Sequence, residues 1–448
     1  MRRIYLILVS IGFVLATFAT PVFLTGQASL KAFNTATAAI VIDQTIPGLG
    51  NKIAIQISKK SPLVQTATQA LIQSAEKISN RKLRSATVDA ISNRKTCVQH
   101  RIGISDSTKQ SILQQLTQAS LVDSISARTF PGGLKAGVFP PLLKESSNCP
   151  QLPQAFFSSP GSAFGGHHSA PGGLPIHEFV NDLSGLGLTD VYRQAYGTSN
   201  QAGLPIVSGN KVSAQKSDVS IDQDLMIAAP IWHDWAKTLV FQWNADGTEF
   251  QELNFGGNGI SDNKGTAGDS RTGGHHILGL AESIKRGLSP AFVITQASAH
   301  AAPSLGNEYK VVNWIRTAAI VAQIDPVATG YLSKDSQSNF RLPPLRRLGD
   351  VDLNAAGQTN LLVEYALHNL SDADFVFTIP AVSIDQVILK SLASEFGYDA
   401  NNVSPYNNQF RNPIFSYLSA ERLAIIYGNK GLSGVRAELQ NLKRLNII

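Results

Sequence analysis

The apolar stretch "AAPIWHDWAKTLVFQW", residues 228–243, contains three groups that could do chemistry. His233 and Asp234 are adjacent, and Lys237 follows one helical turn later. Burying an imidazole, a carboxylate and an ammonium among apolar side chains costs free energy unless the groups are paired or bound to a cation. A divalent cation would supply the missing charge. We therefore predict a metal site at Asp234.

Histidine is concentrated in one third of the chain. Seven of the nine histidines lie between His167 and His300. Imidazole and carboxylate groups are the usual ligands of first-row transition metals, and a chain with two cysteines has few thiolates to offer. The candidate ligands, in chain order, are His177, His233, Asp234, His275 or its neighbour His276, His300 and Asp325.

This ordered set resembles the HD-domain superfamily of metal-dependent phosphohydrolases. "HHSAPGGLPIH" is similar to the start of the helix that carries the family's first ligand, and "HDWAK" is similar to its H-D-x-x-K element. "HHILGLAESI" is similar to the H-x-x-x-G element if His275 is the ligand, because Gly279 then has the right spacing. The resemblance covers residues 165–332. It departs from the family where Trp235 and Ala236 follow the His-Asp pair.

The resemblance also implies roles for individual residues, with Asp234 and Lys237 as the catalytic residues. His177, His233, Asp234 and Asp325 would hold one metal, and His275 and His300 would serve a second metal bridged by Asp234. Iron, manganese, cobalt, nickel and zinc all accept such ligands. Two divalent metals a few ångströms apart can activate a shared water. Lys237 would contact a substrate phosphate or help to protonate the leaving oxygen. The predicted substrate contacts are His168, Lys237, Arg271 and His276, whereas His100 and His368 are interpreted as ordinary surface or packing residues.

Three functions fit this pattern. The first is a phosphomonoesterase or phosphodiesterase acting on a phosphorylated small molecule or nucleotide. The second is a di-iron oxygenase, because the same ligand order occurs in that branch of the superfamily. The third is a non-catalytic sensor or scaffold that keeps a metal for stability. The net charge of +6 is spread along the chain without a sustained basic run, so nucleic-acid binding is only weakly indicated.

The N-terminus predicts export. Met1-Arg2-Arg3 precedes the apolar run "IYLILVSIGFVLATFATPVFLTGQA", which is typical of a secretory signal peptide ending near residue 28. An uncleaved membrane anchor is the alternative, because residues 4–24 are almost long enough to span a bilayer. The protein would then be periplasmic or extracellular. In such a compartment, Cys97 and Cys149 are expected to form one disulfide.

Apolar positions at helical spacing predict a mainly α protein. The resemblance implies that its core is a helical HD domain, with helical extensions on both sides. We divide the chain into a signal peptide or anchor (1–28), a helical N-terminal region with a Pro/Gly-rich connection (29–150), a metal-binding catalytic domain (151–335) and a helical C-terminal region (336–448). Residues 225–243 are predicted to form one helix.

Overall fold

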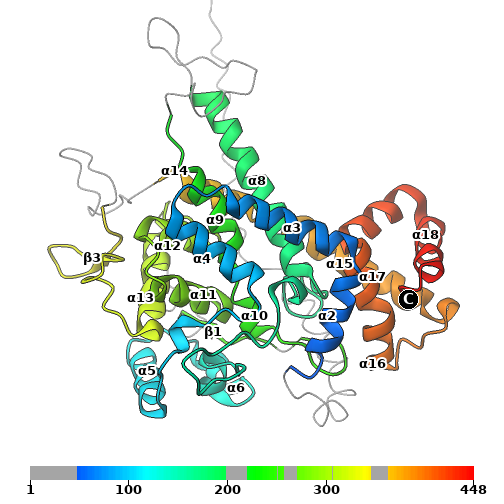
Figure 1. The fold of residues 1–448 in the computed structure, drawn as a ribbon, viewed down its shortest axis with the longest axis horizontal. Coiled ribbons are helices and arrows are strands. Elements are labelled where there is room, and N and C mark those ends of the chain that lie inside the picture. The colour runs from blue at the N-terminus through cyan, green and yellow to red at the C-terminus, as the bar shows by residue number, and fades with distance from the viewer. Residues whose placement is uncertain (1–47, 198–218, 250, 257–269, 305, 345–361) are drawn as a thin grey trace, which may run out of the picture. The chain divides into compact units, whose positions relative to one another are not determined.

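The computed structural model describes residues 48–197, 219–249, 251–256, 270–304, 306–344 and 362–448 (Figure 1). The predicted signal segment, residues 1–28, lies outside the described residues. By its internal contacts the chain from Ile46 to Ile448 forms one compact unit. Helices dominate this unit, and the sheets in the described ranges are antiparallel pairs of two-residue strands, which confirms the mainly α class.

The N-terminal region is a series of capped helices. Ser61 accepts a hydrogen bond from the amide of Val64 and begins one helix, and Asn80 and Ser105 cap two others in the same way. A side-chain oxygen at this position satisfies an amide that has no partner within the helix. The helices of this region are α2 (Asn51–Lys60), α3 (Pro62–Glu76), α4 (Arg81–Ser92), η1 (Gln99–Arg101), α5 (Asp106–Gln118), α6 (Ser124–Thr129), α7 (Gly133–Val138) and η2 (Phe156–Ser158).

The disulfide predicted between Cys97 and Cys149 is present and links residues 52 positions apart. It ties the segment after α4 to the irregular connection that precedes the histidine-rich region. An isolated bridge between Cys97 and Gln151 and the hydrogen bond from the Val98 amide to the Pro150 carbonyl, 2.8 Å long, hold the same two segments together.

The predicted single helix over residues 225–243 is broken in the structure. Helix α9 (Gln223–His233) ends at the first residue of the His-Asp pair, and α10 (Lys237–Val240) begins after a turn closed by the Lys237 amide on the Asp234 carbonyl at 2.8 Å. Pro230 lies inside α9, and a proline in a helix removes a backbone donor. The turn brings Asp234 and Lys237 to the same point in the fold.

The other central elements surround α9. They are α8 (Gly173–Tyr196), β1 (Asn254–Phe255), β2 (Thr272–Gly273), α11 (Gly274–Lys285), α12 (Pro290–Ala297), α13 (Glu308–Ala322), β3 (Ser333–Lys334) and β4 (Phe340–Arg341). Strand β1 pairs with β2, with Asn254 opposite Gly273, and β3 pairs with β4. Helix α9 packs against α8, α12 and α4, and α11 packs against α13 (Figure 1).

The C-terminal region forms its own apolar cluster. Its elements are α14 (Val363–Ser371), α15 (Phe375–Leu392), η4 (Ala393–Phe396), α16 (Val403–Tyr406), η5 (Asn407–Arg411), α17 (Asn412–Leu418) and α18 (Ala420–Arg444). Helix α15 packs along α18 around buried residues such as Leu389, Leu423 and Leu439. The stretch Val363–Phe396 is long and apolar enough to span a membrane by length and composition, a property that it shares with core helices of soluble proteins.

The largest core is common to the N-terminal and central regions. It runs from Leu71 in α3 through Trp232 and Trp235 at the His-Asp turn to Tyr365 in α14. Both indole nitrogens donate hydrogen bonds to α4, Trp232 to the Thr87 hydroxyl at 2.9 Å and Trp235 to the Ala90 carbonyl at 3.0 Å. The N-terminal helices therefore fix the segment that carries the His-Asp pair.

Candidate metal centre

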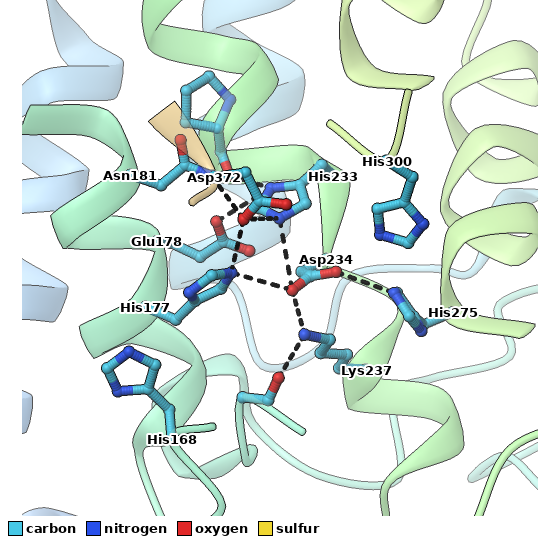
Figure 2. Close-up of polar contacts among 12 residues, drawn as sticks. His168, His177, Glu178, Asn181, His233, Asp234, Lys237, His275, His300 and Asp372 are labelled. Atoms are coloured by element: carbon cyan, nitrogen blue, oxygen red, sulfur yellow. Dashed lines mark hydrogen bonds and ion pairs between the residues drawn. The ribbon is translucent and has the colours of Figure 1, made fainter. Parts of the chain in front are cut away.

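Two histidines and two aspartates meet at the centre of the fold. The Nε2 atom of His177 lies 3.3 Å from Oδ2 of Asp234 and 3.1 Å from Oδ1 of Asp372. The Nε2 atom of His233 lies 3.4 Å and 3.2 Å from the same two oxygens. Figure 2 shows all four side chains converging on one point. Such a square of nitrogen and oxygen atoms could hold a metal ion.

Three helices bring these residues together. His177 lies in the second turn of α8, which starts after Gly172 in a left-handed conformation with φ of +82°. A Cβ at Gly172 would lie 2.4 Å from the side chain of Val64, so the position requires glycine for space as well as for φ. His233 ends α9, and Asp372 caps the C-terminus of α14. Helix α8 packs against both α9 and α14, which fixes the mutual distances.

Asp234 also faces a second group of histidines. Its Oδ1 atom lies 3.0 Å from Nε2 of His275, and a nitrogen of His300 lies within the same group of candidate ligand atoms. Figure 2 shows His275 and His300 on the side of Asp234 opposite His177. The two carboxylate oxygens therefore face different sets of imidazoles, an arrangement in which one carboxylate can bridge two metals.

Gly279 packs α11 on the end of α9. A Cβ at this position would lie 3.6 Å from the His233 carbonyl oxygen and 3.4 Å from the side-chain amide nitrogen of Gln296, which are ordinary contact distances. Space therefore does not require glycine here. The 3.0 Å distance between Nε2 of His275 and Oδ1 of Asp234 identifies His275, not His276, as the residue at the cluster.

Each of the three inner histidines has a carboxylate near its other ring nitrogen, although Nδ1 of His233 is closer to the Pro230 carbonyl, to which it bonds at 2.8 Å. Such a partner orients the imidazole and makes its free nitrogen a better metal ligand. The position of a carboxylate beside Nδ1 also identifies Nε2 as the ring nitrogen that is turned toward the centre. The Nδ1-to-oxygen distances are 3.2 Å for His177 and Asp374, 3.2 Å for His233 and Glu178, and 2.6 Å for His275 and Glu252.

Lys237 is buried beside Asp234 and is not a surface lysine. Its side chain is 4% exposed, and its ammonium donates hydrogen bonds to Oδ2 of Asp234 and to the carbonyl of Gly161. Burial alone would lower the pKa of Lys237. The negative charge of Asp234 has the opposite effect, and the pKa of Lys237 is raised above its ordinary value. The ammonium therefore stays charged next to the bridging carboxylate.

The charges in the cluster hold one another in their ionised forms. Burial alone would raise the pKa of Asp234, but His233, Lys237 and His275 hold it well below its ordinary range. Burial would likewise lower the pKa of His177, yet Asp374, Asp234 and their neighbours raise it well above its ordinary range. The carboxylates that raise the pKa of these imidazoles give the centre a negative charge, which a metal cation would also neutralise.

A further observation supports the fit of these ligand atoms to a metal. Four buried atoms at the centre have no hydrogen-bond partner among the described residues, although each imidazole nitrogen among them lies 3.0–3.4 Å from an oxygen of Asp234. Unpaired buried polar atoms are costly, and a shared cation would satisfy them together. These atoms are Nε2 of His177, Nε2 of His233, Nε2 of His275 and Oδ1 of Asp234.

Asp325 requires a correction. The expectation that it completes the first metal site is not met, because its carboxylate is exposed and accepts the amide hydrogens of Val327 and Ala328 at 2.8 and 3.1 Å. Helix α13 ends before it, with Gln323 in a left-handed conformation. Asp372 occupies the position expected for Asp325.

His168 and His276 lie beside the centre but face other partners. The Nε2 atom of His168 is 2.7 Å from Oδ2 of Asp374, and its Nδ1 is 3.5 Å from Glu421, so His168 supports the carboxylate that orients His177. His276 is fully buried and stacks on His300 with ring centroids 4.1 Å apart. Neither ring is directed at Asp234 as a substrate contact would be.

His368 lies closer to the candidate metal centre than the sequence indicates, whereas His100 does not. His368 is buried with its ring 5.3 Å from that of His233, and its Nδ1 is 2.6 Å from the Thr295 carbonyl oxygen. His100 is a packing residue, paired at 2.8 Å with the buried carboxylate of Glu282 on α11.

His167, by contrast, is directed toward the centre. Its ring lies 5.0 Å from that of His177, and one of its nitrogens belongs to a candidate ligand group with His177 and Asp234.

Arg271 lies at the edge of the molecule. Its side chain is 54% exposed, and its Nε is 3.2 Å from Oδ2 of Asp123. The next residue, Thr272, bonds through its hydroxyl to Nδ1 of His300 at 2.9 Å. Arg271 is thus next in the chain to Thr272, whose hydroxyl contacts the candidate ligand His300.

The comparisons with known proteins give no family for this chain. No protein-family model, curated protein or solved structure matches it. The interpretation of the centre therefore rests on its own residues.

Proposed function

We propose that this protein is a metal-dependent phosphohydrolase, a phosphomonoesterase or phosphodiesterase with two divalent metals at the cluster. The observation that carries the proposal is Asp234, whose two oxygens face two sets of imidazoles while a buried ammonium lies beside it. Two bridged metals and an adjacent cation suit a substrate that carries negative charge on several oxygens. A phosphate ester is such a substrate.

Each residue has a defined task in this proposal. His177, His233 and Asp372 would hold one metal, His275 and His300 would hold the other, and Asp234 would serve both. Metals bound there would lower the pKa of a water and neutralise charge on a phosphoryl group. The outer carboxylates keep the Nε2 atoms of the ligating histidines directed at the centre.

Lys237 would act on the substrate. With metal bound at Asp234, the ammonium of Lys237 would donate a hydrogen bond to a phosphoryl oxygen or a proton to the leaving oxygen. Its second partner, the carbonyl of Gly161, keeps the ammonium at the same place throughout. A fixed donor aimed at developing charge is a large contribution to catalysis.

We further propose that the protein works outside the cytoplasm. The bond between Cys97 and Cys149 supports this location, because disulfides persist mainly in oxidising compartments. A signal peptide in residues 1–28 would be consistent with it.

The test is activity of the mature protein loaded with manganese, iron, cobalt, nickel or zinc against a panel of phosphate mono- and diesters. Release of the alcohol from at least one ester, lost in Asp234→Ala and retained in Asp325→Ala, is the expected result. Metal uptake without release of any alcohol would refute the proposal. Oxygen consumption by the iron-loaded protein in place of ester cleavage would favour a di-iron oxygenase.

A further inference from the structure

A basic cavity lies between the first part of α4 and the C-terminal end of α11. It has a volume of about 760 Å³, and four of its eight lining residues are basic. Arg81 and Lys82 come from the first turn of α4, and Lys285 and Arg286 come from the end of α11. Asp89 is the one acidic residue among the eight. The cavity therefore carries cations on two opposing walls.

The carboxylates at this cavity are already paired. Asp89 lies 3.1 Å from Nη1 of Arg286, and the buried carboxylate of Glu282 lies 2.7 Å from Nε of the same guanidinium. Asp224 does not line the cavity, and it accepts the two backbone amides just before α4 at 2.7 Å. The four cations of the lining against Asp89 and Glu282 leave two positive charges in excess, and Arg286 is fixed by its own partners.

The two lysines keep their charge available for a ligand. Neither Lys82 nor Lys285 has a carboxylate within ion-pair distance among the described residues. The ammonium of Lys82 donates to the Gly287 carbonyl, and that of Lys285 donates to the Ala322 carbonyl at 3.1 Å. A neutral carbonyl positions an ammonium without cancelling its charge. Each ammonium has three donors, so two remain free for an anion.

Contacts across the cavity hold its walls at a fixed separation. The ion pair of Arg286 with Asp89 joins the end of α11 to α4, and the bond from Lys82 to Gly287 joins the same two elements. Gln99, also in the lining, donates its backbone amide to Glu282 at 3.0 Å and so fixes η1 on α11. A site built in advance loses less conformational freedom when a ligand binds.

A diphosphate group matches this arrangement of charge. Lysine binds phosphate as a point charge, and two linked phosphates can each approach one wall. The hydroxyl of Ser85 and the side-chain amide of Gln99 offer hydrogen bonds to the uncharged part of a ligand. The basic residues of the chain form no sustained run, which favours a small anion at this cavity over a nucleic acid.

From these observations, we propose that this cavity binds a small molecule that carries a diphosphate group. Lys82 and Lys285 are the residues that contact its phosphates. No candidate metal ligand lines the cavity, so this site is distinct from the metal centre and does not depend on the proposed phosphohydrolase activity.

The test is calorimetric titration of the purified protein, without added metal, with methylenediphosphonate, a diphosphate analogue that cannot be hydrolysed. Methylphosphonate, which has a single anionic group, is the comparison ligand. Wild type is compared with Lys82→Ala and Lys285→Ala. Lys52→Ala is the matched control, because Lys52 is an exposed lysine of α2 outside the cavity and its loss changes the net charge equally. Lys237→Met reports on binding at the metal centre.

We expect wild type to bind methylenediphosphonate at least about tenfold more tightly than methylphosphonate. Each of Lys82→Ala and Lys285→Ala should weaken methylenediphosphonate binding about tenfold, as loss of a charged hydrogen bond would. Binding to Lys52→Ala and Lys237→Met should match wild type. Equal losses in the three alanine variants would reveal a general effect of net charge and overturn the site. A loss confined to Lys237→Met, or no binding by wild type, would overturn it as well.

Discussion

The Nε2 atom of His275 lies 3.0 Å from one carboxylate oxygen of Asp234, and the other oxygen faces His177 and His233. The protein thus places a single carboxylate between two sets of imidazole nitrogens. A mononuclear site would need only one of these sets. This relationship is the main reason to expect two metals per chain.

The carboxylate of Glu252 should strengthen the metal site at His275. Glu252→Gln keeps the shape of the side chain but removes the charge that supports the imidazole, so affinity for the second metal should fall about 10–100-fold. Titration of the apo-protein with metal, monitored by calorimetry, measures this effect. The first metal should bind as it does in wild type. Glu76→Gln, at an exposed position of α3, is the control. Equal affinity for the second metal in Glu252→Gln and wild type would contradict the assigned role.

Lys237→Met tests the ammonium beside Asp234. If Lys237 donates to the substrate, kcat should fall about 10²–10³-fold while two metals remain bound. Metal content and turnover are measured on the same preparation, so that loss of a donor is distinguished from loss of metal. Lys52→Met, at an exposed position of α2, should behave as wild type. Full turnover in Lys237→Met would remove Lys237 from the mechanism.

Glu249 makes stability depend on pH. Burial raises the pKa of this carboxyl to about 8, and Arg411 offsets the effect only in part. The folded protein therefore binds a proton that the unfolded chain releases near pH 4.5. Stability from this group is complete at low pH and is lost as pH rises from about 4.5 to 8, by up to about 5 kcal/mol. Glu249→Gln should remove this dependence.

Urea unfolding at pH 5.5 and pH 8 measures the effect. The difference between the two pH values in the free energy of unfolding should be smaller in Glu249→Gln than in wild type. Glu76→Gln again serves as the control. A pH dependence that is the same in Glu249→Gln and wild type would show that Glu249 ionises normally.

Much of the centre follows from the sequence because its signals are local. These signals are short-range patterns in the sequence. His233 and Asp234 are adjacent, Lys237 follows one helical turn later, and Gly279 follows His275 at the H-x-x-x-G spacing. The same holds for the mainly α class, which apolar periodicity and serine caps indicate. The break between α9 and α10 was missed because the apolar residues continue through it without a change of period.

Asp372 was missed for a different reason. It follows His300 by 72 positions and becomes a neighbour of His233 only because α14 packs against α8 and α9. No periodicity in the sequence predicts that packing. The one local signal is "SDAD", residues 371–374, where Asp372 and Asp374 lie between two apolar helices. Two acidic residues at a helix boundary are common, so this signal is weak without the fold.

The most direct test of the account is the metal content of wild type, Asp372→Ala and Asp325→Ala, each measured on folded protein. Asp372 lies 3.1 Å and 3.2 Å from the two histidines of the first site, whereas Asp325 is exposed and bonds only to nearby amides among the described residues. We predict two metals per chain in wild type and in Asp325→Ala, and loss of at least one metal in Asp372→Ala. Loss of metal from Asp325→Ala but not from Asp372→Ala, or a folded wild-type protein that binds no metal, would contradict the account.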